Sequence, residues 1–180
     1  QLFGGMHWME EGPVPVGRQW LRGHMNSVSG MWGYHKGGAL PEAAQWQHDL
    51  LRCHHEFARP YLGYGQMLRP PVVTGDLPTI TKKGGDGPFT VLAVEGTAWR
   101  AHDGSVGIFF FNYEDQPHQF TWKKDVAEIA GFDEATKLQL TQWTVEHGAT
   151  PVEQINGGII GGTTDVAPRG IVALKLEVVK

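Results

Sequence analysis

Residues 98–112 read Ala-Trp-Arg-Ala-His-Asp-Gly-Ser-Val-Gly-Ile-Phe-Phe-Phe-Asn, and this stretch decides the fold class. Asp103-Gly104 favours a two-residue β-hairpin turn, because glycine accepts a positive φ at no steric cost. The predicted strands on either side are residues 89–102 and 105–113. Bulky side chains fall on both faces of the second strand, as is typical of a central strand that is covered on both sides. The stretch therefore predicts an antiparallel hairpin inside a sheet.

Further strands are predicted on either side of this hairpin. Residues 72–82 form one strand in this interpretation, interrupted by Pro78, which suits an edge position. Residues 138–145 alternate apolar and polar positions except for a phase slip near Thr141-Gln142, which indicates a β-bulge. Two more strands are expected at residues 118–123 and 172–178, and Gly157-Gly158 and Gly161-Gly162 are expected in turns. Six or seven such strands predict an antiparallel β-sandwich.

The chain before Arg69-Pro70-Pro71 has a different pattern. Residues 1–9 are predicted to form a short buried strand, and residues 10–40 a long loop with one short helix near residues 18–21. Pro41 suits the first turn of a helix, and that helix is expected to end near Arg59-Pro60. Its apolar residues recur every three or four positions and form one stripe: Ala43, Trp46, Leu50, Cys53, Phe57 and Tyr61.

Residues 61–71, Tyr-Leu-Gly-Tyr-Gly-Gln-Met-Leu-Arg-Pro-Pro, resemble the junction in a group of bacterial glycoside-hydrolase-like proteins whose barrel is followed by a C-terminal sandwich. Residues 98–108 resemble the hairpin that follows in those proteins, and Asn112 fits the last position of its motif. Ala167-Pro168-Arg169-Gly170 resembles the end of many glycosidase sandwiches. The resemblance implies that residues 1–70 are the last strand and helix of a (β/α)8 barrel, and that residues 71–180 are a C-terminal β-sandwich.

The resemblance also implies a parent protein that acts on carbohydrate, with the missing N-terminal barrel as the partner of this chain. Composition excludes other partners: a net charge of −4 creates no basic field for nucleic acid or anionic lipid. The longest apolar run is far too short to cross a bilayer. No cofactor is implied.

Substrate-binding residues are expected at the rim of that barrel, because barrel enzymes carry their sites at the carboxyl ends of the strands. If residues 1–9 are the last strand, then His7, Trp8, Glu10 and Glu11 lie at this rim. An aromatic face with imidazole or carboxylate groups suits a sugar. Trp20, Trp32 and Tyr34 are candidates to approach from the loop. The alternative interpretation is that Trp8 packs in a core and that the two glutamates are solvated.

The chain alone is not expected to catalyse glycoside hydrolysis, which requires two carboxyl groups about 5 to 9 Å apart. Glu10 and Glu11 are adjacent, so their side chains point to opposite faces of an extended backbone. The catalytic residues are therefore expected on earlier barrel strands. A metal site is not expected, because His48 lies six and seven residues from His54 and His55 rather than four.

Other interpretations of the whole chain stay open. One is a non-catalytic carbohydrate-binding or structural β-sandwich module, and another is a sandwich whose enzymatic partner has lost its activity. The tryptophans of the second half, Trp99, Trp122 and Trp143, lie in alternating strands, so they are expected in the core rather than on a sugar-binding face. Residues from about 70 onward are expected to fold alone.

Overall fold

The computed structural model describes residues 13–23, 42–84 and 87–179, which are mostly antiparallel β-sheet with two short α-helices. The helical elements are α1 (Pro13–Leu21), α2 (Glu42–Cys53) and a π-helical segment η3 (His54–Gly63) that continues α2. The strands are β1 (Gln66–Leu68), β2 (Val72–Thr74), β3 (Thr79–Gly84), β4 (Gly87–Leu92), β5 (Val94–Arg100), β6 (Val106–Asn112), β7 (His118–Asp125), β8 (Lys137–Thr144), β9 (Gly148–Asn156), β10 (Ile159–Val166) and β11 (Ile171–Val178).

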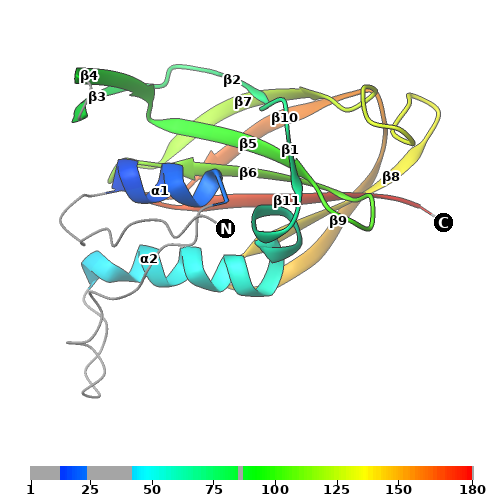
Figure 1. Cartoon of the computed structure of the whole chain (residues 1–180), viewed down its shortest axis with the longest axis horizontal. Coiled ribbons are helices and arrows are strands. Elements are labelled where there is room, and N and C mark those ends of the chain that lie inside the picture. The colour runs from blue at the N-terminus through cyan, green and yellow to red at the C-terminus, as the bar shows by residue number, and fades with distance from the viewer. Residues whose placement is uncertain (1–12, 24–41, 85–86, 180) are drawn as a thin grey trace, which may run out of the picture.

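The strands form three sheets (Figure 1). A six-stranded sheet has the order β1-β5-β6-β11-β8-β9, and a three-stranded sheet has the order β10-β7-β2. The remaining two strands, β3 and β4, pair only with each other and project at one end of the molecule. All the pairings are antiparallel, which confirms the predicted class of sandwich.

The central hairpin is confirmed as β5 and β6, although its turn is longer than two residues. Gly104 donates its backbone N–H to Ala101 O at 3.0 Å, and Ala101 N–H donates to Ser105 O at 2.9 Å. Gly104 has a φ of 88°, so the connection is a three-residue turn that ends in a left-handed glycine. Asp103 accepts hydrogen bonds from the backbone N–H and the hydroxyl of Ser105 and fixes the turn.

Strand β6 separates two hydrophobic cores, and each of its seven residues is buried. On one face, Phe109 and Phe111 join the core that contains the apolar residues of α1, α2 and η3. On the other face, Ile108 and Phe110 join a second core with β7, β10 and β11. The molecule therefore has a helical layer, the six-stranded sheet and the three-stranded sheet in succession (Figure 1).

The apolar stripe of the second helix is buried as predicted at Trp46, Leu50, Cys53, Phe57 and Tyr61. The end predicted near Pro60 is wrong, because the helical segment continues to Gly63. Proline lacks the N–H that an interior helical position donates, and the wider π-helical turn carries the chain past it. The burial of Tyr61 and Leu62, at about 1.5 to 3 kcal/mol for each large apolar side chain, outweighs the missing bond.

Two predicted strands are each divided in the structure. Residues 72–82 form β2, which pairs with β7, and β3, which pairs with β4. Residues 89–102 are divided at Ala93, whose N–H donates to Pro78 O at 2.8 Å. Gly75, with a φ of 138°, turns the chain after β2. A strand pattern alone does not reveal such a change of partner.

The predicted bulge is confirmed: the register between β8 and β9 shifts between Leu140 and Thr141. The two glycine pairs differ from each other. Gly157-Gly158 lies in the connection between β9 and β10, as expected, whereas Gly161-Gly162 lies inside β10. The short helix expected near residues 18–21 begins earlier, at Pro13. The predicted strand at residues 1–9 lies outside the described residues, and no described helix is long and apolar enough to span a membrane.

Candidate polar groove

The predicted substrate-binding residues His7, Trp8, Glu10 and Trp32 all lie outside the described residues, as do Glu11 and Tyr34. Their predicted position at a cleft is therefore still a prediction. Trp20 is described and does not line a cleft, because it is only 2% exposed and meets Phe109 edge-to-face at 5.7 Å. Its indole packs α1 onto the six-stranded sheet. The tryptophans expected in the core, Trp99, Trp122 and Trp143, are buried.

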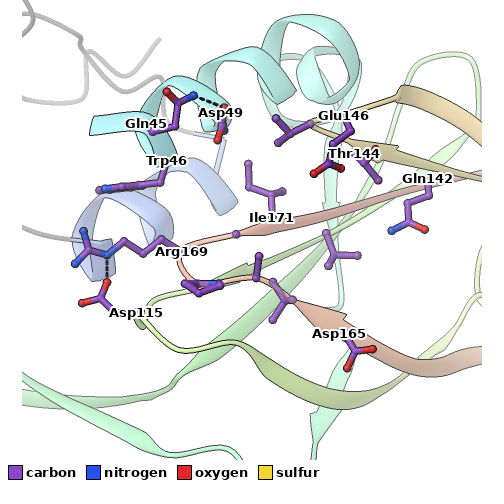
Figure 2. Close-up of a pocket in the computed structure, with 16 residues that line it drawn as sticks. Gln45, Trp46, Asp49, Asp115, Gln142, Thr144, Glu146, Asp165, Arg169 and Ile171 are labelled. Atoms are coloured by element: carbon purple, nitrogen blue, oxygen red, sulfur yellow. Dashed lines mark hydrogen bonds and ion pairs between the residues drawn. The ribbon is translucent and has the colours of Figure 1, made fainter. Parts of the chain in front are cut away.

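A groove of about 860 Å³ opens between α2, the β8–β9 hairpin and the turn that joins β10 to β11 (Figure 2). The α2 wall carries Gln45, Trp46 and Asp49. The residues from the rest of the chain that line the groove are Asp115, Gln142, Thr144, Val145, Glu146 and residues 165–172. Sequence reasoning missed this site because its walls come from four separate segments, and the one motif among them, at residues 167–170, indicates only the end of a sandwich.

The turn between β10 and β11 holds a strained residue. Gly170 N–H donates to Ala167 O at 3.0 Å, which closes a four-residue β-turn with Pro168 second and Arg169 third. Arg169 has a φ of 49° and is the one described non-glycine residue with a positive φ. A proline followed by a positive φ is typical of a type II turn, whose third position favours glycine. An arginine there is costly unless its surroundings fix it.

Those surroundings include two contacts with the segment after β6. Arg169 N–H donates to Glu114 O at 2.8 Å, and the Arg169 guanidinium forms an ion pair with Asp115 (Figure 2). Asn112 is fully buried beneath both segments. Its side-chain amide donates to Gln116 O at 2.7 Å and to Ala167 O at 2.9 Å, and its Oδ1 accepts from Glu114 N–H at 2.9 Å. This asparagine fixes one end of the groove.

The α2 wall is polar toward the groove. Gln45 Nε2 donates to Asp49 Oδ1 at 3.1 Å, and this pair is exposed. Trp46 is 8% exposed, and its ring centroid lies 5.9 Å from that of Phe111, so most of the indole packs on the sheet. The wall therefore offers hydrogen-bonding groups and the margin of one aromatic ring.

The groove is predominantly negative. Its lining contains four carboxylates, Asp49, Asp115, Glu146 and Asp165, and one arginine, Arg169, which already pairs with Asp115. Gln142 and Thr144 add an amide and a hydroxyl. The lining residues in the described part of the chain include no serine, cysteine or histidine. This set suits the binding of a neutral or cationic polar group.

A second, smaller pocket of about 310 Å³ lies between α1, β5 and the segment around Pro70. Arg18 Nε lies 3.0 Å from Glu95 Oε2, and Tyr113 donates its hydroxyl to the same oxygen at 2.7 Å. Burial and the Glu95 carboxylate raise the pKa of Tyr113, so this phenol keeps its proton. The Arg18 guanidinium also lies 5.3 Å from the ring centroid of Phe89. The network joins α1 to the sheet.

His48, Cys53, His54 and His55 are the histidines and the cysteine of the described helical layer. No three His, Cys, Asp or Glu side chains in the described ranges are grouped closely enough to hold a metal ion. Burial, followed by the charges of His55 and Arg59, lowers the pKa of His54. Burial raises the pKa of the Cys53 thiol, so it remains a protonated, unreactive core residue.

No family model matches the chain, and no curated protein sequence matches it. Solved structures that resemble it include glycoside hydrolases. α-Galactosidase I from Mortierella vinacea is 12% identical, with a TM-score of 0.44 over 96% of this chain and 36% of that chain. A Bacillus halodurans protein described as an α-N-acetylgalactosaminidase is 12% identical, with a TM-score of 0.42 over 76% of this chain and 25% of that chain.

A family 51 arabinofuranosidase from Xanthomonas axonopodis pv. citri is 20% identical, with a TM-score of 0.32 over 54% of this chain and 21% of that chain. The chain thus spans about a fifth to a third of the length of these three proteins. The similarity lies in the fold of the backbone, and it assigns no site residue.

Proposed function

We propose that the chain is the C-terminal region of a carbohydrate-active protein of the glycoside-hydrolase type. In this proposal residues 1–70 complete an α/β barrel, residues 71–180 form the sandwich that supports it, and residues near 7–34 line part of the substrate cleft. The support comes from the motifs at residues 61–71 and 98–112. His7, Trp8, Glu10 and Trp32 are the proposed sugar contacts.

The observation that carries the supporting role is the packing of the helical layer on the six-stranded sheet. Thr97 Oγ1 and Trp99 Nε1 both donate to Leu21 O, at 3.0 and 3.2 Å, and fix the end of α1. Trp143 Nε1 donates to Glu56 Oε2 at 3.0 Å and fixes η3. In this proposal α1 and η3 belong to the end of the barrel. Hydrogen bonds from the buried side chains of Thr97, Trp99 and Trp143 therefore anchor the barrel to the sandwich.

The coding sequence upstream of residue 1 tests this proposal directly. A barrel domain has about 250 residues and alternates strands with helices, so we expect most of that pattern there, with carboxylates at the ends of the strands. A reading frame without such alternation would contradict the proposal.

Hydrolysis of aryl glycosides provides a second test. We expect the complete gene product to release the phenol and residues 1–180 alone to release none, because the acid and the nucleophile or base lie on the upstream strands. Turnover by the 180-residue chain would place the catalytic carboxylates within it and would refute this division of roles.

The groove favours one alternative, a carbohydrate-binding module that acts without a barrel. Its amide, hydroxyl and carboxylate groups match the hydrogen-bonding groups of a sugar, and they lie within the described chain. Calorimetric titration with neutral oligosaccharides tests this function. We expect Gln142→Ala and Gln45→Ala each to weaken binding about fivefold, the effect of losing one hydrogen bond.

Gln154→Ala is the matched control, because Gln154 is an exposed glutamine on β9 that does not line the groove. If this variant weakens binding as much as the groove variants do, the sugar does not occupy the groove. If no oligosaccharide binds to the chain, the module function is excluded and the supporting role is unaffected.

A further inference from the structure

Strand β10 has one free edge. It pairs with β7 along residues 159–166, and β7 pairs on its other side with β2. In the described part of the chain, no backbone hydrogen bond joins β10 to any segment other than β7. Alternate N–H and C=O groups of an edge strand point away from its partner. The free side of β10 therefore presents a row of unpaired donors and acceptors.

This edge lacks the protection that the other edges have. Edges are usually kept unpaired by a short length, by proline or by charged residues. Strands β1 and β2 have three residues each, and β9 contains Pro151 and Glu153. Strand β10 has eight residues, Ile-Ile-Gly-Gly-Thr-Thr-Asp-Val, with no proline, no lysine and one charge. Ile159 at its start is 73% exposed.

There is also space for an additional strand beside β10. Phe110 of β6 contacts Phe120 and Trp122 of β7, so β7 lies over β6, and β2 lies over β5. By its position in the sheet, β10 then lies over β11, and the six-stranded sheet continues past it with β8 and β9. The groove occupies this side: Gln142 and Thr144 of β8 and Asp165 and Val166 of β10 all line it (Figure 2).

The charges of the groove indicate which strand would fit. Asp49, Glu146 and Asp165 have no cationic side chain from the groove lining to balance them, because Arg169 pairs with Asp115. Asp165 accepts a hydrogen bond from the neutral Gln119 at 3.0 Å. On a strand added next to β10, a lysine or arginine near Asp165 would complete an opposite-charge cross-strand pair.

We propose that the free edge of β10 is a docking site for an extended, basic segment of another protein, which adds to the small sheet as a fourth strand. Backbone hydrogen bonds to β10 provide the binding, and alternate side chains face the polar floor of the groove. Lysine or arginine side chains pair with the carboxylates at its margin. This site is independent of the proposed barrel-supporting role, and a strand bound there would compete with a sugar for the groove in the alternative carbohydrate-binding function.

Selection from a displayed library of random 12-residue peptides tests the proposal. We expect the enriched peptides to carry lysine or arginine at alternate positions with β-branched residues between them. Bound to the chain, they should slow the hydrogen exchange of amides in residues 161–166. The charge-reversing variant Asp165→Lys should weaken their binding roughly tenfold, as an attractive cross-strand pair becomes repulsive.

Glu153→Lys is the matched control, because it reverses one exposed charge on β9, the edge of the other sheet; we expect it to leave peptide binding unchanged. The proposal is overturned by enrichment of acidic or neutral peptides, by equal loss in both variants, by protection outside β10, or by failure to enrich any peptide. Concentration-dependent dimerisation of the free chain that protects residues 161–166 would also overturn it, in favour of a second copy as the occupant.

Discussion

Arg169 occupies a backbone conformation that arginine rarely adopts, with a φ of 49° in the turn between β10 and β11. A left-handed conformation costs a residue with a Cβ roughly 1 to 2 kcal/mol, and glycine avoids this cost. The ion pair with Asp115, whose side chain is 70% exposed, contributes at most about 1 kcal/mol. The arginine is therefore retained at an energetic disadvantage, at the margin of the groove.

Replacement of Arg169 separates the backbone strain from the ion pair. Both Arg169→Gly and Arg169→Ala remove the guanidinium, but only glycine also removes the strain. We expect the glycine variant to exceed the alanine variant in free energy of unfolding by about 1 kcal/mol. Urea denaturation measures the difference. An alanine variant at least as stable as the glycine variant would show that the turn is not strained.

His54 makes stability depend on pH. Its folded pKa is lowered by burial, so below the unfolded value of about 6.5 the unfolded chain binds a proton that the folded chain does not. The contribution of the neutral His54 side chain to stability is complete above that pH and is lost as the pH falls toward the folded pKa. We expect His54→Gln to lose less unfolding free energy than the unmodified chain between about pH 7.5 and 5.5.

The control for this prediction is His48→Gln, since the His48 side chain is 47% exposed. Its stability should change with pH as that of the unmodified chain does. If the His54 and His48 variants have the same pH dependence, then another group carries the effect.

Helix α1 depends on a glycine for its close approach to the sheet. A Cβ on Gly17 would lie 2.3 Å from the Phe111 ring and 2.8 Å from the Tyr113 ring. Alanine in place of glycine gains about 1 kcal/mol in helix propensity, whereas overpacking a close-packed core costs about 1 to 3 kcal/mol. The steric cost exceeds the propensity gain because both rings are buried.

We therefore expect Gly17→Ala to lower the free energy of unfolding by about 1 to 2 kcal/mol, although it adds a better helix former. Thermal or urea denaturation measures this. Gln19→Ala is the control on the same helix, and it should change stability by less than about 0.5 kcal/mol. A stabilised Gly17→Ala variant would mean that α1 can move away from the sheet without penalty.

At the scale of the whole molecule, the helical layer and the six-stranded sheet share one core. Phe109, Phe111 and Trp143 are no more than 1% exposed, and each belongs to the core that the helices complete. Burial of each is worth about 1.5 to 3 kcal/mol or more, and a domain of this size is stable by only 5 to 15 kcal/mol. Loss of the helical layer would therefore remove an amount of free energy comparable to the whole stability of the domain.

This packing changes what is expected of the isolated sandwich. The sequence pattern favours independent folding from about residue 70, whereas the structure leads us to expect that residues 71–180 alone aggregate and bind a hydrophobic dye. Size-exclusion chromatography and calorimetry of the fragment and the 180-residue chain test this. A monomeric fragment with a cooperative thermal transition would show that the sandwich core alone is sufficient.

The alternation of apolar and polar residues by itself determined the antiparallel sheets, the β5–β6 hairpin, the bulge at Leu140 and the apolar stripe of α2, because period and turn chemistry are local properties. The choice of which strands pair with each other, in contrast, does not depend on the local sequence. Residues 72–82 have one strand pattern, yet they serve two sheets, and Gly161-Gly162 has a turn composition, yet it lies in a strand that β7 stabilises.

Only the tertiary structure decided where a site could lie. The groove brings α2 together with β8 and the turn after β10, which lie roughly 90 to 130 residues further along the chain, and no spacing in the sequence encodes that proximity. The free edge of β10 likewise depends on which strands are paired. The apolar and polar pattern of a strand or helix follows from which of its own side chains are buried. A cleft or an open edge follows from the packing of elements that are distant in the sequence.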